Sequence, residues 1–217
     1  MTGPVIFTEA DKTKGSDMGQ ILISAFKFVI AILLFPMVVA SAISFSGHLS
    51  TYPATYEEFL MWGIGAFLLL YLFFHQFWGF YEFGQKIVAN IFKFIAPLDR
   101  LVTNLLPFYL VLILLAFYVT KEFLKIKSCD PYFIFFAGFA LAMHIILAAQ
   151  DMQNQEKSPI KPTYLLEIAF VVVVAVSLSI LLLDLIVGKW TFPDFLTSTM
   201  DLSLEYYQNI FLKIMSN

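Results

Sequence analysis

Long stretches without a charged side chain dominate this chain. Four of them contain no Asp, Glu, Lys or Arg, and a fifth is interrupted only by Glu167 and Asp184 near its ends. In chain order they are residues 28–56, 59–81, 101–120, 131–150 and 164–187. About 20 apolar residues in a helix cross the roughly 30 Å hydrocarbon core of a bilayer. The pattern therefore predicts an all-α, polytopic membrane helix bundle with about five transmembrane helices.

The composition excludes several other classes of protein. Hydrophobic residues make up 60% of the 217 residues and charged residues 13%, whereas soluble domains average about 45–50% and 25%. A large catalytic domain outside the membrane has no room beside the predicted spans. The net charge of −3 offers no basic surface for nucleic acid. The single cysteine, Cys129, cannot form a disulfide within the chain, so it indicates no redox compartment.

The predicted organisation has three parts. Residues 1–19 are polar and are expected to form an N-terminal arm, residues 20–189 the transmembrane bundle, and residues 190–217 an amphipathic C-terminal helix. Within the bundle, the spans are expected at 20–46, 59–81, 101–121, 131–150 and 164–187.

Two segments have an apolar side and a polar side at helical spacing. In residues 82–98 the apolar side holds Phe83, Ile87, Ile91 and Ile95, and the polar side holds Glu82, Lys86, Asn90 and Lys93. In residues 190–217 the apolar side holds Leu196, Met200, Leu204, Tyr207, Phe211 and Ile214, and the polar side holds Ser198, Asp201, Glu205 and Lys213. This spacing predicts amphipathic helices at the interface or against protein. Since the second polar side has more acid than base, we expect it to dock on the chain's own helices or a partner.

The positions of lysine and arginine indicate an orientation. If the N-terminus is inside, eight of the 13 basic residues fall in inner segments and five in outer segments. The loop 47–58 between the first two spans has none. Because basic residues concentrate on the inner side, we predict a multi-pass integral protein of a bacterial inner membrane. Its N-terminus is expected inside and its C-terminus outside.

Five ionisable side chains fall within the predicted spans, namely Lys27, His75, His144, Glu167 and Asp184. Such residues are costly in a bilayer and are often functional. His75 and His144 fall at similar depth and are candidate ligands for a haem or a metal, while Glu167 and Asp184 are candidate proton or ion sites. The alternative interpretation is structural, because carboxylates near helix ends can extend to water.

Several short segments resemble one family of membrane proteins. They are residues 69–74, 80–90, 105–109, 136–144, 151–155 and 205–208. Together they are similar to small multi-pass site-2-protease-like zinc metallopeptidases, in which an apolar span leads into a Phe-Gly-His-Glu-x-x-His motif. The resemblance covers residues 60–212 and implies a related helical frame.

The metal motif of that family is missing from this chain. The motif needs two imidazoles four residues apart, with a carboxylate beside the first. The matching positions here hold Gln85, Lys86 and Ala89. An amide, an ammonium and a methyl group cannot hold zinc or activate water. The resemblance therefore implies a relative that binds no metal at these positions and is not an enzyme.

Three interpretations of function follow from the sequence. The first is a non-enzymatic scaffold or accessory subunit of a larger membrane complex, with bound lipids and with other membrane protein subunits as partners. The second is a small transporter, channel or proton-relay component that uses the intramembrane histidines, Glu167 and Asp184. The third is a haem- or metal-binding redox subunit with His75 and His144 as ligands. Two amphipathic segments and the lack of a soluble domain favour the first.

Overall fold

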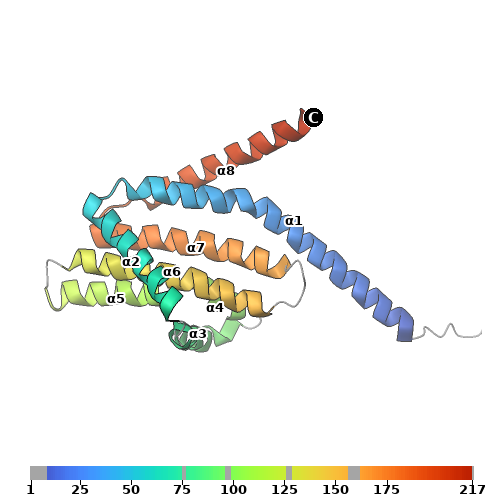
Figure 1. Ribbon diagram of the computed structural model, residues 1–217, viewed down its shortest axis with the longest axis horizontal. Coiled ribbons are helices and arrows are strands. Elements are labelled where there is room, and N and C mark those ends of the chain that lie inside the picture. The colour runs from blue at the N-terminus through green and yellow to red at the C-terminus, as the bar shows by residue number, and fades with distance from the viewer. Residues whose placement is uncertain (1–8, 75–76, 96–98, 126–128, 156–161, 217) are drawn as a thin grey trace, which may run out of the picture.

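The computed structural model describes residues 9–74, 77–95, 99–125, 129–155 and 162–216 (Figure 1). Its helices are α1 (Glu9–Leu49), α2 (Ala54–Phe73), α3 (Trp78–Ile91), η2 (Lys93–Ile95), α4 (Asp99–Leu105), α5 (Phe108–Glu122), α6 (Asp130–Gln155), α7 (Pro162–Val187) and α8 (Phe192–Met215). Helices and the turns between them account for all of these ranges, so the predicted all-α fold is confirmed.

Four helical segments are long and apolar enough to cross a membrane. They are Ile21–Leu49 within α1, Ala54–Phe73, Asp130–Asn154 within α6, and Pro162–Val187. A helix suits the lipid interior because its backbone N–H and C=O groups bond to each other within the segment. The chain is therefore a membrane protein with transmembrane helices, as the uncharged stretches predict.

The predicted span at 101–121 is not one continuous helix. Pro107 separates α4 from α5, because it has no N–H to donate and restricts the residue before it. α5 has 15 residues, about 22 Å at a rise of 1.5 Å per residue, which is shorter than the hydrocarbon core. α3 packs over the start of α5, where a Cβ atom at Gly84 would touch the rings of Phe108 and Tyr109.

Other helix boundaries also differ from the predicted ones. α1 begins inside the predicted polar arm at 1–19, so part of that arm is helical, and residues 1–8 lie outside the described ranges. The predicted span 59–81 is divided between α2 and α3, and the predicted amphipathic segment 82–98 begins within α3 and continues into η2. The predicted C-terminal helix corresponds to α8.

Both amphipathic helices pack on the bundle through a side rich in small or polar residues. The buried residues are Tyr81, Gly84 and Val88 in α3, and Phe195, Thr199 and Ser203 in α8. Members of the predicted apolar sides are exposed, among them Phe83, Ile91, Met200 and Leu204. Lipid tails are as apolar as these large side chains, so burying them in protein offers little advantage.

The helices form a bundle in which α1 packs on α7, α7 on α6, and α6 on both α2 and α5 (Figure 1). α1 and α7 run in the same direction. Lys27 of α1 donates to Thr163 at the start of α7 (3.1 Å), and His48 near the end of α1 contacts Thr191 just after α7 (3.1 Å). Figure 1 shows that the N-terminal part of α1 and the C-terminal part of α8 extend away from this bundle.

α2 and α6 meet backbone to backbone. A Cβ atom at Gly63 would lie 1.9 Å from the carbonyl oxygen of Phe135, and one at Gly138 would lie 2.2 Å from that of Leu60. Real Cβ atoms essentially never approach other atoms this closely, so glycine alone fits at both positions. The contact is reciprocal, since each helix contributes a glycine that receives the backbone of the other.

The α1–α7 pair also buries small residues. On α1 and α7 these are Ala31, Ala40, Ser41, Ala169, Ala175 and Ser179. The hydroxyls of Ser41 and Ser179 bond to carbonyls of their own helices, at Val38 and Ala175. Small side chains let helices approach closely, and the resulting van der Waals contact replaces the hydrophobic force that is absent between helices in lipid.

The reciprocal glycine contact makes a stability prediction. We expect Gly63→Ala or Gly138→Ala to lower the free energy of unfolding in detergent by about 1–3 kcal/mol or more, because the backbones of α2 and α6 must separate. The matched control is Gly65→Ala on the same helix, where an added Cβ atom meets nothing within 4 Å. Thermal unfolding of the three variants tests this. If Gly63→Ala is as stable as Gly65→Ala, the close contact does not hold the bundle together.

Candidate functional site

The carboxylate of Asp184, at the end of α7, is fully buried and accepts four hydrogen bonds. Its Oδ1 atom accepts from the hydroxyls of Tyr52 (2.8 Å) and Thr191 (2.7 Å). Its Oδ2 atom accepts from the backbone N–H groups of Thr191 (2.6 Å) and Phe192 (2.7 Å). Since α8 begins at Phe192, Asp184 caps the start of α8, where N–H groups have no partner within the helix. We call these four residues the Asp184 cluster.

The same end of the bundle ties the α1–α2 turn to the start of α8. His48 Nε2 lies 3.1 Å from the carbonyl oxygen of Thr191. The ammonium of Lys189 donates to the carbonyl of Thr51 (2.8 Å). Gly188 takes φ +72°, a conformation that favours glycine and lets the chain turn from α7 towards α8. These contacts fix where α8 starts relative to α1.

The phenol of Tyr52 belongs to the turn between α1 and α2. Burial raises the pKa of Tyr52 above its usual value of about 10. The neighbouring Asp184 carboxylate is a further cause of this rise. The hydroxyl therefore stays protonated at physiological pH and remains a donor to Asp184. Asp184 is a structural cap in this arrangement, with its hydrogen-bonding capacity occupied by the chain itself.

The polar contacts at the two ends of the bundle lie one bilayer apart. Twenty-one residues separate Lys27 from His48 on α1, and the same number separate Thr163 from Asp184 on α7. Each interval is about 32 Å at 1.5 Å per residue, close to the roughly 30 Å hydrocarbon core. The Lys27–Thr163 contact and the Asp184 cluster thus mark opposite ends of the bundle, about one hydrocarbon thickness apart, and we call these two levels the Lys27 boundary and the Asp184 boundary.

Among the residues that the structure describes, the predicted ionisable candidates do not meet at one site. Glu167 is half-buried one turn after Thr163, at the Lys27 boundary, and about 25 Å of α7 separates it from Asp184 at the opposite boundary. His75 lies outside the described residues. Across the ranges that the structure does describe, no group of three His, Cys, Asp or Glu side chains is placed to hold a metal. The haem or metal role of His75 with His144 stays a prediction.

His144 of α6 lies inside the bundle with one unused ring nitrogen. Its side chain is buried, and its ring is hydrogen-bonded to the backbone of Asn104 in α4. In the described part of the chain, His144 Nε2, the Tyr81 hydroxyl and Gln85 Oε1 are all buried without a hydrogen-bond partner. The rings of Tyr81 and His144 are 6.2 Å apart. Each unpaired buried polar atom costs about 1–3 kcal/mol, so this place lowers the stability of the bundle.

The positions that match the missing zinc motif lie on α3. Gln85 and Ala89 are half-buried, and Lys86 is exposed. Lys86 pairs with Glu82 (2.9 Å), an exposed contact one helical turn apart. Pairs of this kind contribute little to stability. These three side chains supply neither a metal ligand set nor a base for hydrolysis.

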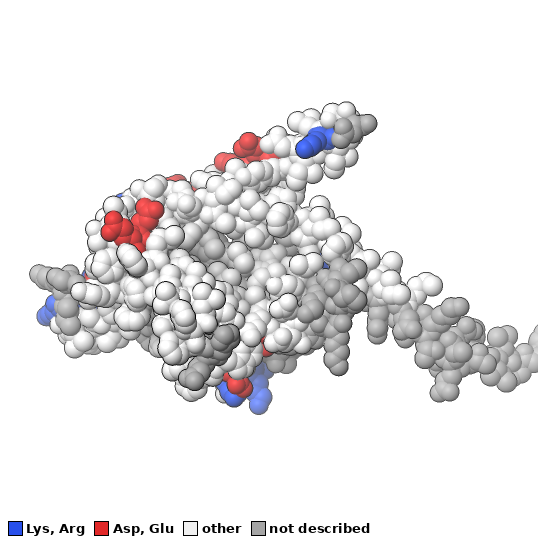
Figure 2. All heavy atoms as spheres, viewed as in Figure 1, with Lys and Arg blue, Asp and Glu red and all other residues white. Residues whose placement is uncertain are grey.

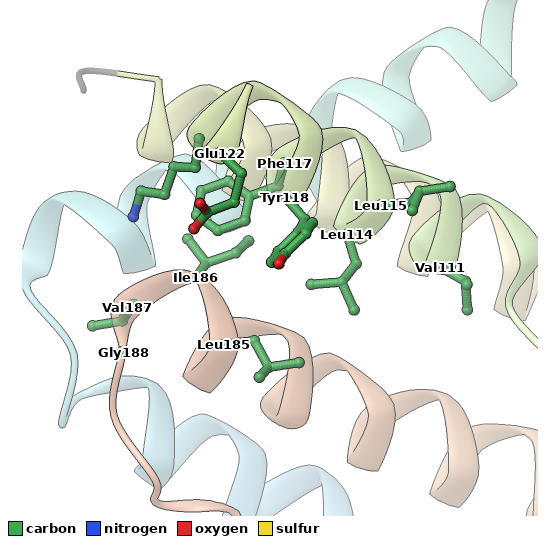
Figure 3. A pocket seen from close by; sticks show the side chains of 11 residues that line it. Val111, Leu114, Leu115, Phe117, Tyr118, Glu122, Leu185, Ile186, Val187 and Gly188 are labelled. Atoms are coloured by element: carbon green, nitrogen blue, oxygen red, sulfur yellow. The ribbon is translucent and has the colours of Figure 1, made fainter. Parts of the chain in front are cut away.

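An apolar groove of about 590 Å³ lies between α5 and α7 (Figure 3). Its lining includes Leu114, Leu115, Leu185 and Ile186, with Tyr118, Lys121 and Glu122 towards one end. Lys121 also pairs with Asp130 at the start of α6 (3.3 Å). A long apolar groove with polar groups at one end suits a lipid acyl chain. The bound lipid expected from the sequence stays a prediction, and this groove is a place that fits it.

Comparison with known proteins adds no assignment to these sites. No family model, no curated protein and no solved structure matches the chain. The likeness to site-2-protease-like metallopeptidases therefore rests on the short segments described above and stays a prediction.

Sequence reasoning missed the hydrogen-bond partners of the two buried polar side chains, Asp184 and His144. Tyr52 is 132 residues from Asp184 along the chain, a separation at which local patterns carry no information. A local signal did exist at Thr191, since Thr followed by Phe and Pro is typical of a helix start. That signal, with a carboxylate two turns upstream, is what could have indicated a cap at Asp184.

The Asp184 cluster makes a second stability prediction. We expect Asp184→Asn to lower the free energy of unfolding by about 3 kcal/mol, because an amide cannot accept from all four donors. The matched control is Asp194→Asn, an exposed carboxylate in the first turn of α8, expected to change stability by less than about 0.5 kcal/mol. Unfolding in detergent and protease cleavage near Gly188 report the two effects. Equal behaviour of the two variants would reject the capping role.

Proposed function

We propose that this chain is a non-enzymatic accessory or scaffold subunit of a larger membrane complex. The observation that carries the proposal is the N-terminal part of α1, residues 18–26, called here the α1 arm. It precedes the Lys27–Thr163 contact and so extends past the start of α7, its neighbour in the bundle. Figure 1 shows this end of α1 leaving the bundle.

The α1 arm is apolar although it lies outside the bundle. Its exposed side chains include Met18, Ile21, Leu22, Ile23 and Phe26. α7, the neighbour of α1 in the bundle, begins only at Pro162, next to the residue that Lys27 contacts. An apolar helix that extends past its neighbours in the bundle exposes a contiguous hydrophobic surface, and such surfaces mark interaction sites. A partner subunit that covers the arm accounts for its composition.

The other two functions have less support. A transporter or proton relay that uses Glu167 and Asp184 would need them to act at opposite boundaries, and the Asp184 carboxylate is occupied by four donors. A protease would need a base and a metal where Gln85, Lys86 and Ala89 stand. The scaffold interpretation asks for neither.

We also propose five passes with the N-terminus inside, in a bacterial inner membrane. The support for the inside N-terminus is the distribution of Lys and Arg, and the support for five passes is the direction of the helices. α1 and α7 are parallel, and short connections make α2 opposite to α1 and α6 opposite to α7. The chain therefore has to return across the bundle between α2 and α6, and α5 runs in that direction, since Lys121 at its end pairs with Asp130 at the start of α6.

The scaffold proposal predicts a complex that depends on the α1 arm. Extraction into native lipid nanodiscs, followed by native mass spectrometry, should give a particle larger than the 24.7 kDa chain. Leu22→Ser with Phe26→Ser should release the chain from it, because the apolar contact is lost. The control is Leu68→Ser with Leu69→Ser, two exposed positions on α2 within the predicted lipid zone. A wild-type chain that is purely monomeric under these conditions contradicts the proposal.

The orientation can be tested with the single native cysteine. Cys129 precedes α6 at the Asp184 boundary, which the proposed topology places outside. A membrane-impermeant maleimide should therefore label Cys129 in intact spheroplasts. Cys129→Ser combined with Lys93→Cys moves the thiol to the proposed inner side, where labelling should require permeabilisation. The reverse pattern would show that the N-terminus is outside.

A further inference from the structure

The groove between α5 and α7 is polar at the end where both helices terminate (Figure 3). Lys121 and Glu122 lie in the last turn of α5, and Gly188 directly follows α7. Because the N–H of Gly188 donates to the carbonyl of Asp184 (2.8 Å), this end of the groove lies at the Asp184 boundary. From there the lining runs towards the middle of the bundle through apolar side chains as far as Val111.

The length of the groove matches one leaflet of a bilayer. From Glu122 to Val111 the helix advances eleven positions, about 16 Å at 1.5 Å per residue. One leaflet contributes half of the roughly 30 Å hydrocarbon core. An acyl chain whose headgroup is at the polar end therefore fits lengthwise in the groove. A membrane-spanning helix of a partner protein needs about twice this length, so a lipid is the better occupant.

The polar end offers charges of both signs. The Glu122 carboxylate is exposed and makes no hydrogen bond or ion pair within the part of the chain that the structure describes. The Lys121 ammonium pairs with Asp130 (3.3 Å) and lies 4.7 Å from the centre of the Phe117 ring. Since an ammonium has three N–H donors, this pair leaves Lys121 donors for a second acceptor. An anionic and a cationic group can therefore bind here side by side.

The hydroxyl of Tyr118 adds a neutral polar group one helical turn deeper. Tyr118 is exposed and lies four residues before Glu122, about 6 Å nearer the middle of the bundle. Figure 3 shows both side chains pointing from α5 towards α7. A phospholipid has its groups in the same order, with the charged headgroup first, the ester carbonyls next and the acyl chain last. The Tyr118 hydroxyl is thus at the level of an ester carbonyl, to which it can donate.

We propose that this groove binds a phospholipid whose headgroup carries a primary ammonium, such as phosphatidylethanolamine. The ammonium of the lipid donates to the Glu122 carboxylate, and Lys121 donates to the phosphate. The acyl chain lies between Leu114 of α5 and Leu185 of α7. A headgroup without a cation leaves Glu122 unpaired beside a phosphate of the same sign, and a quaternary ammonium has no N–H to donate. The site needs no partner subunit, so it is independent of the scaffold role.

The headgroup preference can be measured by native mass spectrometry of the full chain. The micelles contain equal amounts of phosphatidylethanolamine, phosphatidylcholine and phosphatidylglycerol with the same acyl chains. We expect phosphatidylethanolamine to bind about threefold or more above either other lipid, the effect of one partly exposed ion pair. Glu122→Gln should remove this preference. The matched control Asp194→Asn, an exposed carboxylate at the start of α8, should retain it. Equal binding of the three lipids, or a preference that survives Glu122→Gln, overturns the inference.

The groove itself is tested by filling it. Leu185→Trp adds bulk on the α7 wall, so the chain should lose bound phospholipid of all three headgroups. The matched control is Leu112→Trp, at an exposed position of α5 that does not line the groove, and thermal unfolding of both variants shows that they are folded. Lipid binding that Leu185→Trp leaves unchanged overturns the inference. A photo-crosslinking residue at position 115 should join lipid, and a crosslink to a protein segment instead also overturns the inference.

The charges elsewhere on the surface distinguish this end of α5 from other apolar grooves. The groove of about 500 Å³ between α1 and α7 has no ionisable residue in its lining, which includes Phe35, Leu165 and Ile210. Figure 2 shows broad areas of the surface without any charged atoms. An acyl chain can lie in either groove, but only the groove between α5 and α7 has the charges to select a headgroup.

Discussion

The bundle depends on helices approaching one another where lipid removes the usual hydrophobic drive. Between α2 and α6 the approach is close enough that the backbone of each helix occupies the space of a side chain on the other, at Gly63 and Gly138. α6 then contacts α5 and α7 as well, so its position sets that of both. If α2 and α6 were held apart by a methyl group, the packing around α6 would loosen in every direction.

The same constraint explains why hydrophobicity alone does not decide which face of a helix is buried. A soluble protein would bury Phe83 and Ile91 of α3, yet these residues are exposed and Gly84 and Val88 are buried. α8 follows the same pattern, with Thr199 and Ser203 turned inward. The amphipathic spacing therefore predicted that these segments are helices but did not predict which side meets protein. Periodicity measures polarity, and polarity says little about packing in a medium that is itself apolar.

Other features were open to prediction to different degrees. The uncharged stretches predicted the long helices, because crossing a bilayer requires both length and the absence of charge. The break in the span at 101–121 could have been predicted from Pro107, although a proline in a membrane helix more often bends the helix than ends it. The cap at Asp184 had a local signal at Thr191, but its Tyr52 donor could not be predicted, since Tyr52 is far away in sequence. A carboxylate near a span end looks the same in sequence whether it binds an ion or caps a helix.

The cap at Asp184 and the direction of α8 are consequences of one geometry. Asp184 holds the first backbone N–H groups of α8 at the end of α7, so α8 has to begin at that end of the bundle. The contact of Tyr207 with Leu33 then directs α8 back along α1. A carboxylate at the far end of α7 thereby sets where α8 begins, and α1 sets the direction in which it runs.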